Sequence, residues 1–267
     1  MKLEVLISTM HQSDLSLAEN MNIKSDAIII NQCDKDDYHK KEINSGCIRM
    51  ISVKDRGLSK SRNLAIDNSE SDICVIADDD LKYQDGYKNI ILNAYEKYSD
   101  ADIIAFDVPS TNQMRPTSSL KEGKVDFLHS MKIASFQITF KRMSIVDNNI
   151  RFNELFGAGA KYTCGEENIL LVEAIKKGLK IYFVNKNIAI VDHNESTWFN
   201  GFDERLFRTK GAMFYEMNKK LAHVLILQFA IRKYRLYKKK INIFEAYRYM
   251  KSGLIEHKQL HKNKNID

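Results

Sequence analysis

Short apolar runs alternate with amphipathic stretches along roughly the first 200 residues of the chain. Each run is four to six residues long and ends at polar or turn-forming residues, which is typical of a buried strand. The predicted strands are LEVLIS (3–8), AIII (27–30), IRMISV (48–53), ICVIA (73–77) and DIIAF (102–106). Apolar residues at helical spacing predict helices over 12–21, 58–68 and 86–98. Strands that alternate with helices indicate an α/β fold with a mostly parallel sheet flanked by helices.

The pattern becomes less regular after Asp107, and residues 108–135, rich in Ser, Thr and Lys, predict an irregular excursion. The elements predicted beyond it are a strand over 135–142, a helix over 166–177, and short strands over 181–185 and 188–192. Gly178 provides the stop signal for that helix. From about Phe202 the chain is amphipathic and predicts helices to its end.

Charge is distributed unevenly along the chain. The net charge is +6, but from Arg205 onward 16 Lys or Arg face 4 Asp or Glu, which gives +12 there and leaves −6 for the remainder. We therefore expect one domain over 1–202, with halves over about 1–107 and 108–202. A helical basic tail over 203–267 follows, and its charge predicts contact with an anionic partner.

Cysteine usage and the N-terminus indicate a cytoplasmic protein. None of the four cysteines forms a C-x-x-C pair, and Cys74 lies inside an apolar run, which argues for reduced thiols and against a disulfide framework or a zinc site. The N-terminal MKLEVLIST lacks a basic region followed by a long apolar core, so we expect a strand and no signal peptide.

Three adjacent carboxylates, Asp78, Asp79 and Asp80, directly follow the predicted strand 73–77. Their mutual repulsion raises their proton affinity unless a cation compensates. A hard divalent cation prefers oxygen ligands and often binds one or two carboxylates together with substrate phosphates. Because ligands of open α/β sheets bind at the carboxyl ends of strands, the position favours a metal-diphosphate site. The alternative is an acidic turn that stabilises the start of the next helix.

Two further segments combine small residues with charge. In DRGLSKSRN (55–63), Gly57 allows a tight turn, and Arg62 on the first turns of a helix can point at a nucleotide phosphate; an ordinary solvated basic face is the alternative. In FGAGAKYTCGEEN (156–168), small residues allow a close backbone approach to a ligand, and Glu166 and Glu167 begin a helix. One of these acids is a candidate general base, and the alternative is a helix cap.

The segment VDHNESTW (191–198) follows a predicted strand. His193 is a candidate metal ligand or phosphate contact, although a lone His more often serves as a structural hydrogen-bond partner. Trp198, the only tryptophan, either stacks on a sugar or fills a gap in the structure.

Taken in order, LISTM, GLSKSRN, ADDD, GEEN and DHNESTW resemble glycosyltransferase family 2 and its nucleotide-diphospho-sugar transferase (GT-A) fold. The resemblance covers about residues 1–200 and is strongest to bacterial enzymes that build capsular or other cell-surface polysaccharides. It implies a metal-dependent, inverting transfer of a sugar from a nucleotide diphosphate sugar, expected to be a UDP-sugar, to a saccharide acceptor.

The resemblance also implies roles for individual residues. Asp78 and Asp80 match the family's Asp-x-Asp, with Asp80 as the direct ligand of Mn²⁺ or Mg²⁺ and His193 as a further candidate ligand. Glu167 matches the second member of the family's acidic pair and is the expected base, next to Glu166; here Glu replaces the usual Asp and adds a methylene of reach. The residues expected to contact the nucleotide are Ser8, Thr9, Asn31 or Asp34, Arg62, Asp78 and Asp79.

The tail adds an expectation about location. LAHVLILQFAI (221–231) is too short to span a bilayer, which needs about 20 residues. It continues into RKYRLYKKK (232–240), and such a helix can lie on an anionic membrane surface. This predicts peripheral contact with the inner face of the cell membrane through 221–240 and suits a lipid-linked saccharide acceptor. The alternative is that 221–231 packs on the first domain and that the basic stretch is a solvated face or a contact within a homo-oligomer.

Three other functions compete with this interpretation. A nucleic-acid-binding protein would use the basic tail, but the acids at 78–80 and 166–167 would repel the ligand, so no nucleic acid is expected. A sugar nucleotidyltransferase usually carries a Gly-rich loop after the first strand, where this chain has STMHQSD without a glycine. A regulatory domain that binds a nucleotide sugar without turnover stays open.

Overall fold

The computed structural model describes residues 1–111, 120–192 and 201–263. Nine of the strands in these residues form the central sheet: β1 (Leu3–Met10), β2 (Asp26–Gln32), β3 (Asp37–Ile43), β4 (Gly46–Val53), β5 (Ile73–Asp78), β7 (Ile103–Asp107), β8 (Gly123–Lys124), β9 (Ile138–Lys141) and β10 (Ile181–Asn187). Their order across the sheet is β3-β4-β2-β1-β5-β9-β7-β10-β8. Two short strands, β6 (Leu81–Tyr83) and β11 (Ala189–Val191), form a separate antiparallel ribbon.

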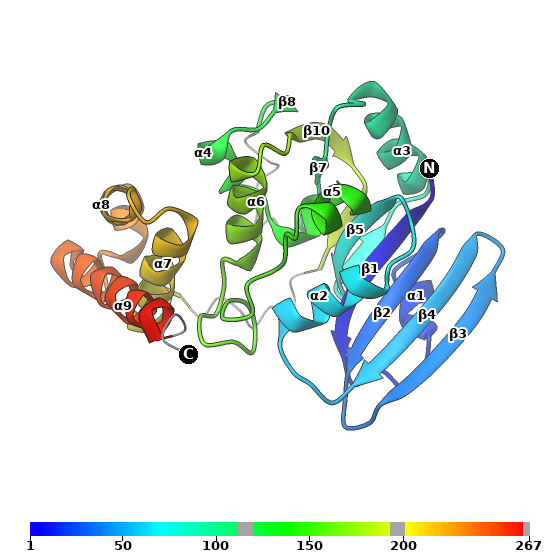
Figure 1. The fold of residues 1–267 in the computed structure, drawn as a ribbon, viewed down its shortest axis with the longest axis horizontal. Helices are drawn as coiled ribbons and strands as arrows, with labels where there is room; N and C mark the ends of the chain where they lie inside the picture. The colour runs from blue at the N-terminus through cyan, green and yellow to red at the C-terminus, as the bar shows by residue number, and fades with distance from the viewer. Residues whose placement is uncertain (112–119, 193–200, 264–267) are drawn as a thin grey trace.

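Helices cover both faces of the sheet and form a group of their own at one end of the molecule (Figure 1). The helices are α1 (Ser16–Asn20), α2 (Leu58–Asn68), α3 (Tyr87–Lys97), α4 (Phe127–Ser130), α5 (Arg142–Asp147), α6 (Glu166–Lys176), α7 (Glu204–Met217), α8 (Ala222–Tyr237) and α9 (Ile243–Asn263), with a 3₁₀ turn over Ser135–Gln137. Strand β3 lies at the edge of the sheet farthest from α7, α8 and α9 (Figure 1).

The alternation of side chains along the strands explains the two layers of helices. Val5 and Ile7 of β1 pack on one face with residues of α1 and α3, whereas Leu6 between them packs on the other face with α2, α5 and α6. Both faces are fully buried there, as expected for central strands that are apolar at every position. The predicted α/β fold with a sheet between helices is confirmed.

Strand directions differ from the expectation of a mostly parallel sheet. The pairs β1/β2, β1/β5, β2/β4 and β7/β10 are parallel, but β3/β4, β5/β9, β7/β9 and β8/β10 are antiparallel. Strand β9 inserts between β5 and β7 after the excursion that follows β7, and it runs opposite to both neighbours. The long connection lets the chain return in this direction without a crossover helix.

Several element predictions need correction. Strand β3 was missed because its sequence DYHKKEI is polar; charged and exposed, it forms the edge of the sheet, where such residues discourage pairing with another molecule. The helix predicted over 12–21 is only α1, because the Asn31 side chain binds both the N–H and the C=O of Gln12 and holds that segment in a loop. The excursion 108–135 contains β8 and α4.

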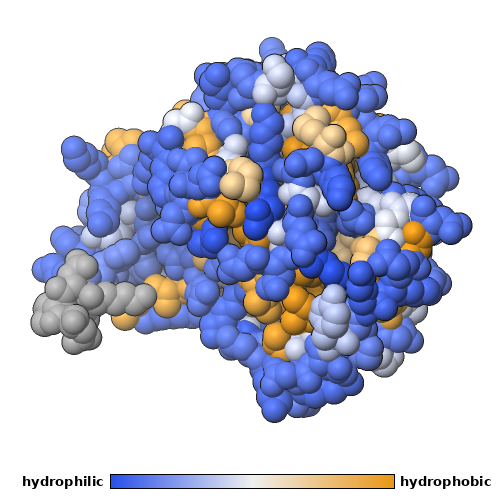
Figure 2. Space-filling view, turned by 45° about the vertical axis from the view of Figure 1, so that its right-hand side comes forward, coloured by the Kyte–Doolittle hydropathy of each residue, from blue (hydrophilic) through white to orange (hydrophobic). Residues whose placement is uncertain are grey.

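The predicted helical tail is present as α7, α8 and α9, which share a core with α6. Helices α7 and α9 cross in close backbone contact at two glycines. A Cβ atom on Gly211 would lie 1.8 Å from the Met250 carbonyl oxygen, and one on Gly253 would lie 2.0 Å from the Arg208 carbonyl oxygen. Among the described helices, none combines the length and the apolar character needed to cross a membrane. The face in Figure 2 is mostly hydrophilic, with hydrophobic residues in separate patches.

Candidate active site

The carboxyl ends of three neighbouring parallel strands bring several of the predicted residues together. Strand β1 lies between β2 and β5, so Ser8 is level with Asp78, and Thr9 is level with Asn31. Ser8 accepts a hydrogen bond from the Ser61 hydroxyl of α2 at 2.8 Å. This edge of the sheet is where open α/β folds bind ligands.

The three adjacent acids have different surroundings. The Asp79 carboxylate accepts a hydrogen bond of 2.6 Å from the Thr9 hydroxyl, and Asp78 Oδ1 accepts one of 2.7 Å from Arg62 Nη2. Burial, and then the charges of Asp78 and Asp79, raise the pKa of Asp80 to about 6. A divalent cation would relieve this excess of negative charge, and the all-oxygen donor set suits Mg²⁺ or Mn²⁺. Asp78 and Asp80 therefore fit the predicted metal role.

Arg62 lies inside the protein and joins the two acidic motifs. Its side chain is 1% exposed and stacks on the Phe152 ring, with the guanidinium carbon 5.3 Å from the ring centre. One guanidinium nitrogen donates to Asp78 at 2.7 Å and the other donates to Glu166 at 2.9 Å. Sequence reasoning expected this side chain near the nucleotide, and the structure gives it two protein carboxylates as partners.

The small residues of the FGAGA segment allow its backbone to approach another segment closely. In the structure that segment is the start of α2. The Ala158 carbonyl accepts from the Leu58 N–H at 3.0 Å, and the Phe156 carbonyl accepts from the Ser59 hydroxyl at 2.6 Å. A Cβ on Gly157, whose φ is +108°, would lie 3.1 Å from Ser59 Oγ. The GLSKS and FGAGA segments therefore pack on each other and fix the distance between α2 and the start of α6.

Glu166 and Glu167 begin α6, as predicted, directly after Gly165 in a left-handed conformation. Burial, and then the neighbouring charge of Glu166, raise the pKa of Glu167 to about 7. A carboxylate with this pKa can accept a proton near neutral pH. Glu167 is only partly exposed and protonates more readily than an ordinary glutamate, and its role as the general base stays a prediction.

Lys210 of α7 is a neighbour of this acidic pair that sequence reasoning missed. Burial lowers its pKa, but Cys164 and Glu167 outweigh this effect and raise the pKa above its ordinary value. The lysine therefore stays charged and partly offsets the negative charge at Glu167. Lys210 is 43 positions further along the chain, and nothing in the amphipathic pattern of the tail distinguishes it from a solvated lysine.

Asn31 and Asp34, the two candidates for contact with the nucleotide base, differ in exposure. Asn31 is fully buried, and its side-chain amide bonds the backbone of Gln12 and the Ser52 hydroxyl. Asp34 is exposed and pairs with Arg56 at 2.7 Å. Asn31 thus shapes the loop after β1, and Asp34 lies on the protein surface just after β2.

His193 and Trp198 lie outside the described residues. The strand that leads to His193 is β11, whose pairing with β6 places its end beside the triple acid. The Asp192 N–H donates to the Asp80 carbonyl at 3.0 Å, and the Asp192 charge adds to those that raise the Asp80 pKa.

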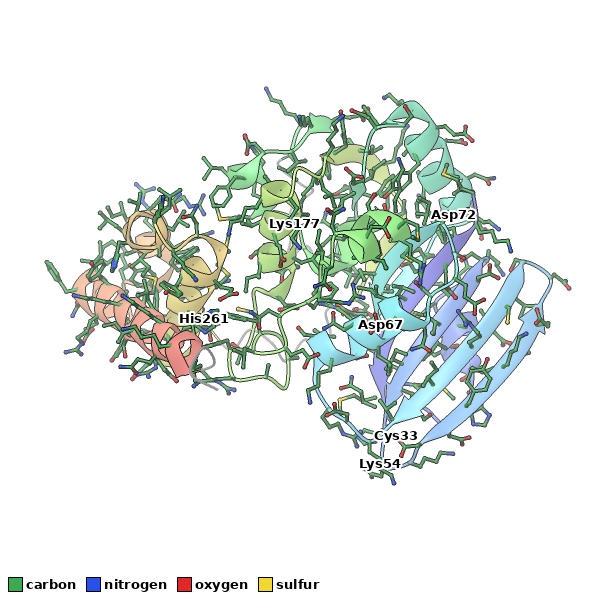
Figure 3. All side chains as sticks on the ribbon, in the orientation of Figure 1. Cys33, Lys54, Asp67, Asp72, Lys177 and His261 are labelled. Carbon is green, nitrogen blue, oxygen red and sulfur yellow. The ribbon has the colours of Figure 1, made fainter. Side chains whose placement is uncertain are left out.

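A second group of potential metal ligands lies in the tail. Hydrogen bonds of 2.7 and 2.6 Å join Glu216 of α7 to Nε2 of His257 and of His261, both on α9, near the labelled His261 of Figure 3. Metal-bound histidines usually donate their second ring N–H, but Nδ1 of His257 is buried without a partner among the described residues. We therefore interpret the group as a hydrogen-bonded link between the two helices. The His-x-x-x-His spacing of His257 and His261 is the sequence signal for this group, and it was not among the predicted sites.

Comparisons with known proteins identify the family. The model of glycosyl transferase family 2 matches residues 15–160, more than half of the chain, which includes Arg62 and the triple acid but ends before Glu166. No curated protein matches the chain significantly.

The solved structures that match include residues 1–349 of S. aureus TarS. The TM-score is 0.62 at 15% identity, over 90% of this chain and 74% of that chain. For the same protein in complex with UDP-GlcNAc the TM-score is 0.65 at 16% identity, over 92% of this chain and 77% of that chain. Its complex with UDP gives 0.62 at 14%, with the same coverage. The fold is therefore the GT-A fold of nucleotide-sugar transferases. The chain belongs to glycosyltransferase family 2, and the protein is a glycosyltransferase.

Proposed function

We propose that the protein is a metal-dependent, inverting glycosyltransferase that moves a sugar from a UDP-sugar to a saccharide acceptor in the synthesis of a cell-surface polysaccharide. The observation that carries the proposal is the buried Arg62, which bonds Asp78 of the first acidic motif and Glu166 of the second. A metal-diphosphate site and a general base need to face one another across the reacting sugar. One residue that holds both motifs supports this division of roles.

On the donor side, Asp80 and Asp78 would hold the divalent cation, which supplies Lewis-acid stabilisation of the charge on the departing diphosphate. Thr9, Ser8 and Asp79 stand at the same strand ends and are proposed to border the nucleotide. Asn31 would act by shaping the loop at Gln12, and Asp34 would contact the nucleotide from the protein surface. The TarS complexes with UDP-GlcNAc and UDP support a uridine nucleotide, because they have the same fold.

On the acceptor side, Glu167 is proposed to remove the proton of the attacking hydroxyl. Its pKa of about 7 suits a base that works near neutral pH. A base on the face opposite the leaving group favours a single displacement, which inverts the configuration at the sugar carbon. Arg62 touches neither reacting group and is proposed as a positioning residue that orients both acidic motifs.

The tail is proposed to bring the enzyme to an anionic membrane from the cytoplasmic side. Val224, Ile231 and Leu236 of α8 are 62%, 59% and 63% exposed, and Phe244 at the start of α9 is 84% exposed. Cations of 232–240 accompany these apolar side chains. Flotation with liposomes should show binding only when they contain anionic lipid. If the protein binds neither kind of liposome, the exposed apolar side chains of α8 and α9 would instead form a contact within a homo-oligomer.

The function is tested by thermal shift and turnover with a panel of nucleotide diphosphate sugars, each with and without Mn²⁺. One nucleotide should stabilise the wild-type protein in a metal-dependent manner, and Asp80→Asn should abolish that response. Asp147→Asn, on an exposed residue at the end of α5, is the matched control and should respond like wild type. Metal-dependent binding without turnover in the presence of acceptors would instead indicate a regulatory domain.

A further inference from the structure

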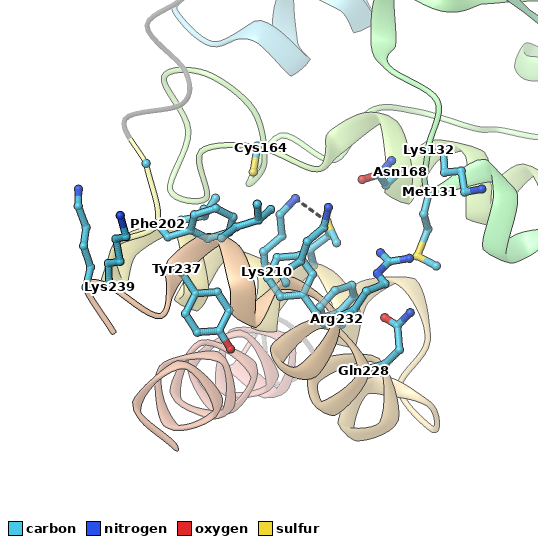
Figure 4. Close-up of a pocket in the computed structure, with 18 residues that line it drawn as sticks. Met131, Lys132, Cys164, Asn168, Phe202, Lys210, Gln228, Arg232, Tyr237 and Lys239 are labelled. Carbon is cyan, nitrogen blue, oxygen red and sulfur yellow. Dashed lines mark hydrogen bonds between the residues drawn. The ribbon is translucent and has the colours of Figure 1, made fainter. Parts of the chain in front are cut away.

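A large pocket lies between the helical tail and the start of α6. Its volume is about 1020 Å³. In Figure 4, Cys164 and Asn168 approach it from the α6 side, and Lys210, Arg232 and Tyr237 approach it from α7 and α8. The pocket is separate from the proposed donor site, because neither the triple acid nor the end of β1 lines it.

The charge of the pocket has one sign. Among the described residues that line it, none is Asp or Glu. The six cations are Lys132, Lys210, Arg232, Lys233, Lys239 and Lys240. None of the six forms an ion pair with a carboxylate of the described residues, whereas Arg208 nearby pairs with Glu256 at 2.8 Å. Lys210 is partly offset by the charge of Glu167, but the other five cations have no carboxylate partner among the described residues. A cavity with this excess of positive charge favours an anionic ligand.

The pocket also has an apolar floor. Phe229 and Tyr237 are buried behind it, and Leu236, which is 63% exposed, lies at its margin. A small inorganic anion gains nothing from contact with such a surface. Aromatic and aliphatic side chains next to a cluster of cations suit a ligand with a charged group and an apolar chain.

The position of the pocket connects it to the proposed base. Cys164 and Asn168, which line it, flank Glu166 and Glu167 in sequence. Lys210 lines the pocket and interacts electrostatically with Glu167. A ligand seated here therefore lies next to the group that is proposed to deprotonate the acceptor.

We propose that this pocket is the acceptor subsite and that it binds a lipid-linked saccharide through its phosphate or diphosphate. The anionic group lies among the cations of α8, the apolar chain follows the aromatic floor, and the saccharide extends past Lys210 toward Glu167. The inference rests on the proposed function, and it assigns a substrate class and a set of specificity residues to the acceptor side.

The test is calorimetric titration of the full-length protein, without membranes, with farnesyl diphosphate, farnesol and inorganic diphosphate. Farnesyl diphosphate should bind at least about 10-fold more tightly than either of the other two probes, because only it uses both the cations and the floor. Arg232→Glu should weaken its binding by about 10-fold or more. Arg235→Glu changes the charge by the same amount on the same helix but outside the pocket, and should stay within about 2-fold of wild type.

A second matched pair tests the floor. Leu236→Ser should weaken the binding of farnesyl diphosphate several-fold, whereas Leu227→Ser, on the same helix but outside the pocket, should leave the binding unchanged. Equal loss in Arg232→Glu and Arg235→Glu would mean general attraction to the basic tail and would overturn the proposal. Equal affinity for inorganic and farnesyl diphosphate would overturn the lipid-linked ligand.

The titration also separates this proposal from the transferase mechanism. UDP binding is measured on the same samples and should be equal in wild type and Arg232→Glu. If UDP binds with metal but farnesyl diphosphate does not bind, the donor side stands and the acceptor proposal is overturned. If farnesyl diphosphate binds in an Arg232-dependent manner without any nucleotide response, the pocket stands and the nucleotide-sugar mechanism fails.

Discussion

Glu167 lies where its charged form is disfavoured, so Glu167→Gln should remove activity and stabilise the protein at the same time. The carboxyl has a pKa of about 7 in the folded protein, against an ordinary value of 4.5. The folded state therefore binds more protons than the unfolded state between these two pH values, and stability falls as the pH rises through that window. A pKa difference of about 2.5 corresponds to about 3.5 kcal/mol, at about 1.4 kcal/mol for each pKa unit. Because Glu167 is partly exposed and solvent screens it, the expected effect is at most about 3 kcal/mol.

The expected result depends on pH. Because Gln has no charge to bury, Glu167→Gln should equal wild type near pH 4.5 and exceed it by up to about 3 kcal/mol in free energy of unfolding at pH 8. Its turnover should fall by about 10² to 10⁴, the range for loss of a general base. Urea unfolding at pH 5 and pH 8 measures the first effect, and a donor-dependent transfer assay measures the second.

Glu173→Gln provides the control on the same helix. Glu173 is partly exposed and pairs with Lys177 at 3.4 Å, so its replacement should change neither stability nor turnover appreciably. A Glu167→Gln protein that is no more stable than wild type at pH 8, or equally stabilised at pH 5 and pH 8, would refute the role of burial. Retained turnover would refute its role as the base.

Three more outcomes are expected. Arg62→Met should lose about 3–5 kcal/mol of unfolding free energy in urea, because it leaves two carboxylates without their buried cation; a loss below 1 kcal/mol would contradict the buried pairing. Gly211→Ala should lower the melting temperature by several degrees, because its Cβ would lie 1.8 Å from the Met250 carbonyl oxygen, and an unchanged melting temperature would mean that α7 and α9 separate easily. Wild-type kcat/KM should fall about tenfold for each pH unit below about 7, as Glu167 takes up its proton; a profile that is flat between pH 5.5 and 7 would exclude this group.

The positions of the residues proposed for the donor side could be predicted from sequence because they depend on local elements. The triple acid follows a strand whose five apolar residues are unmistakable, and the topology of α/β sheets then places it beside the ends of neighbouring strands. The acidic pair begins a helix that has clear start and stop signals. Motif order added the family, which the comparison with known families confirms over residues 15–160.

The rest depends on contacts between distant parts of the chain. A charged residue at a helix start reads as exposed, so the burial of Arg62 could not be predicted without Glu166, which is 104 positions away. Strand β3 was missed because an edge strand needs no apolar face. Strand β9 was predicted, but its place between β5 and β7 could not be, because it depends on how the chain returns. The pocket was missed because α6 and α8 each supply only part of it.

The link made by Arg62 also sets the order in which the site can form. Its bond to Asp78 closes a loop of 16 residues, whereas its bond to Glu166 closes one of 104. Because closing a longer loop costs more entropy, we expect α2 and β5 to meet early and α6 to dock later. Until α6 docks, the buried Arg62 guanidinium is paired with Asp78 but lacks Glu166. A fragment that ends near residue 150 should therefore fold poorly. The segment that carries α2 and β5 thus depends on α6 for part of its stability, and the two are expected to be inherited together rather than exchanged between enzymes.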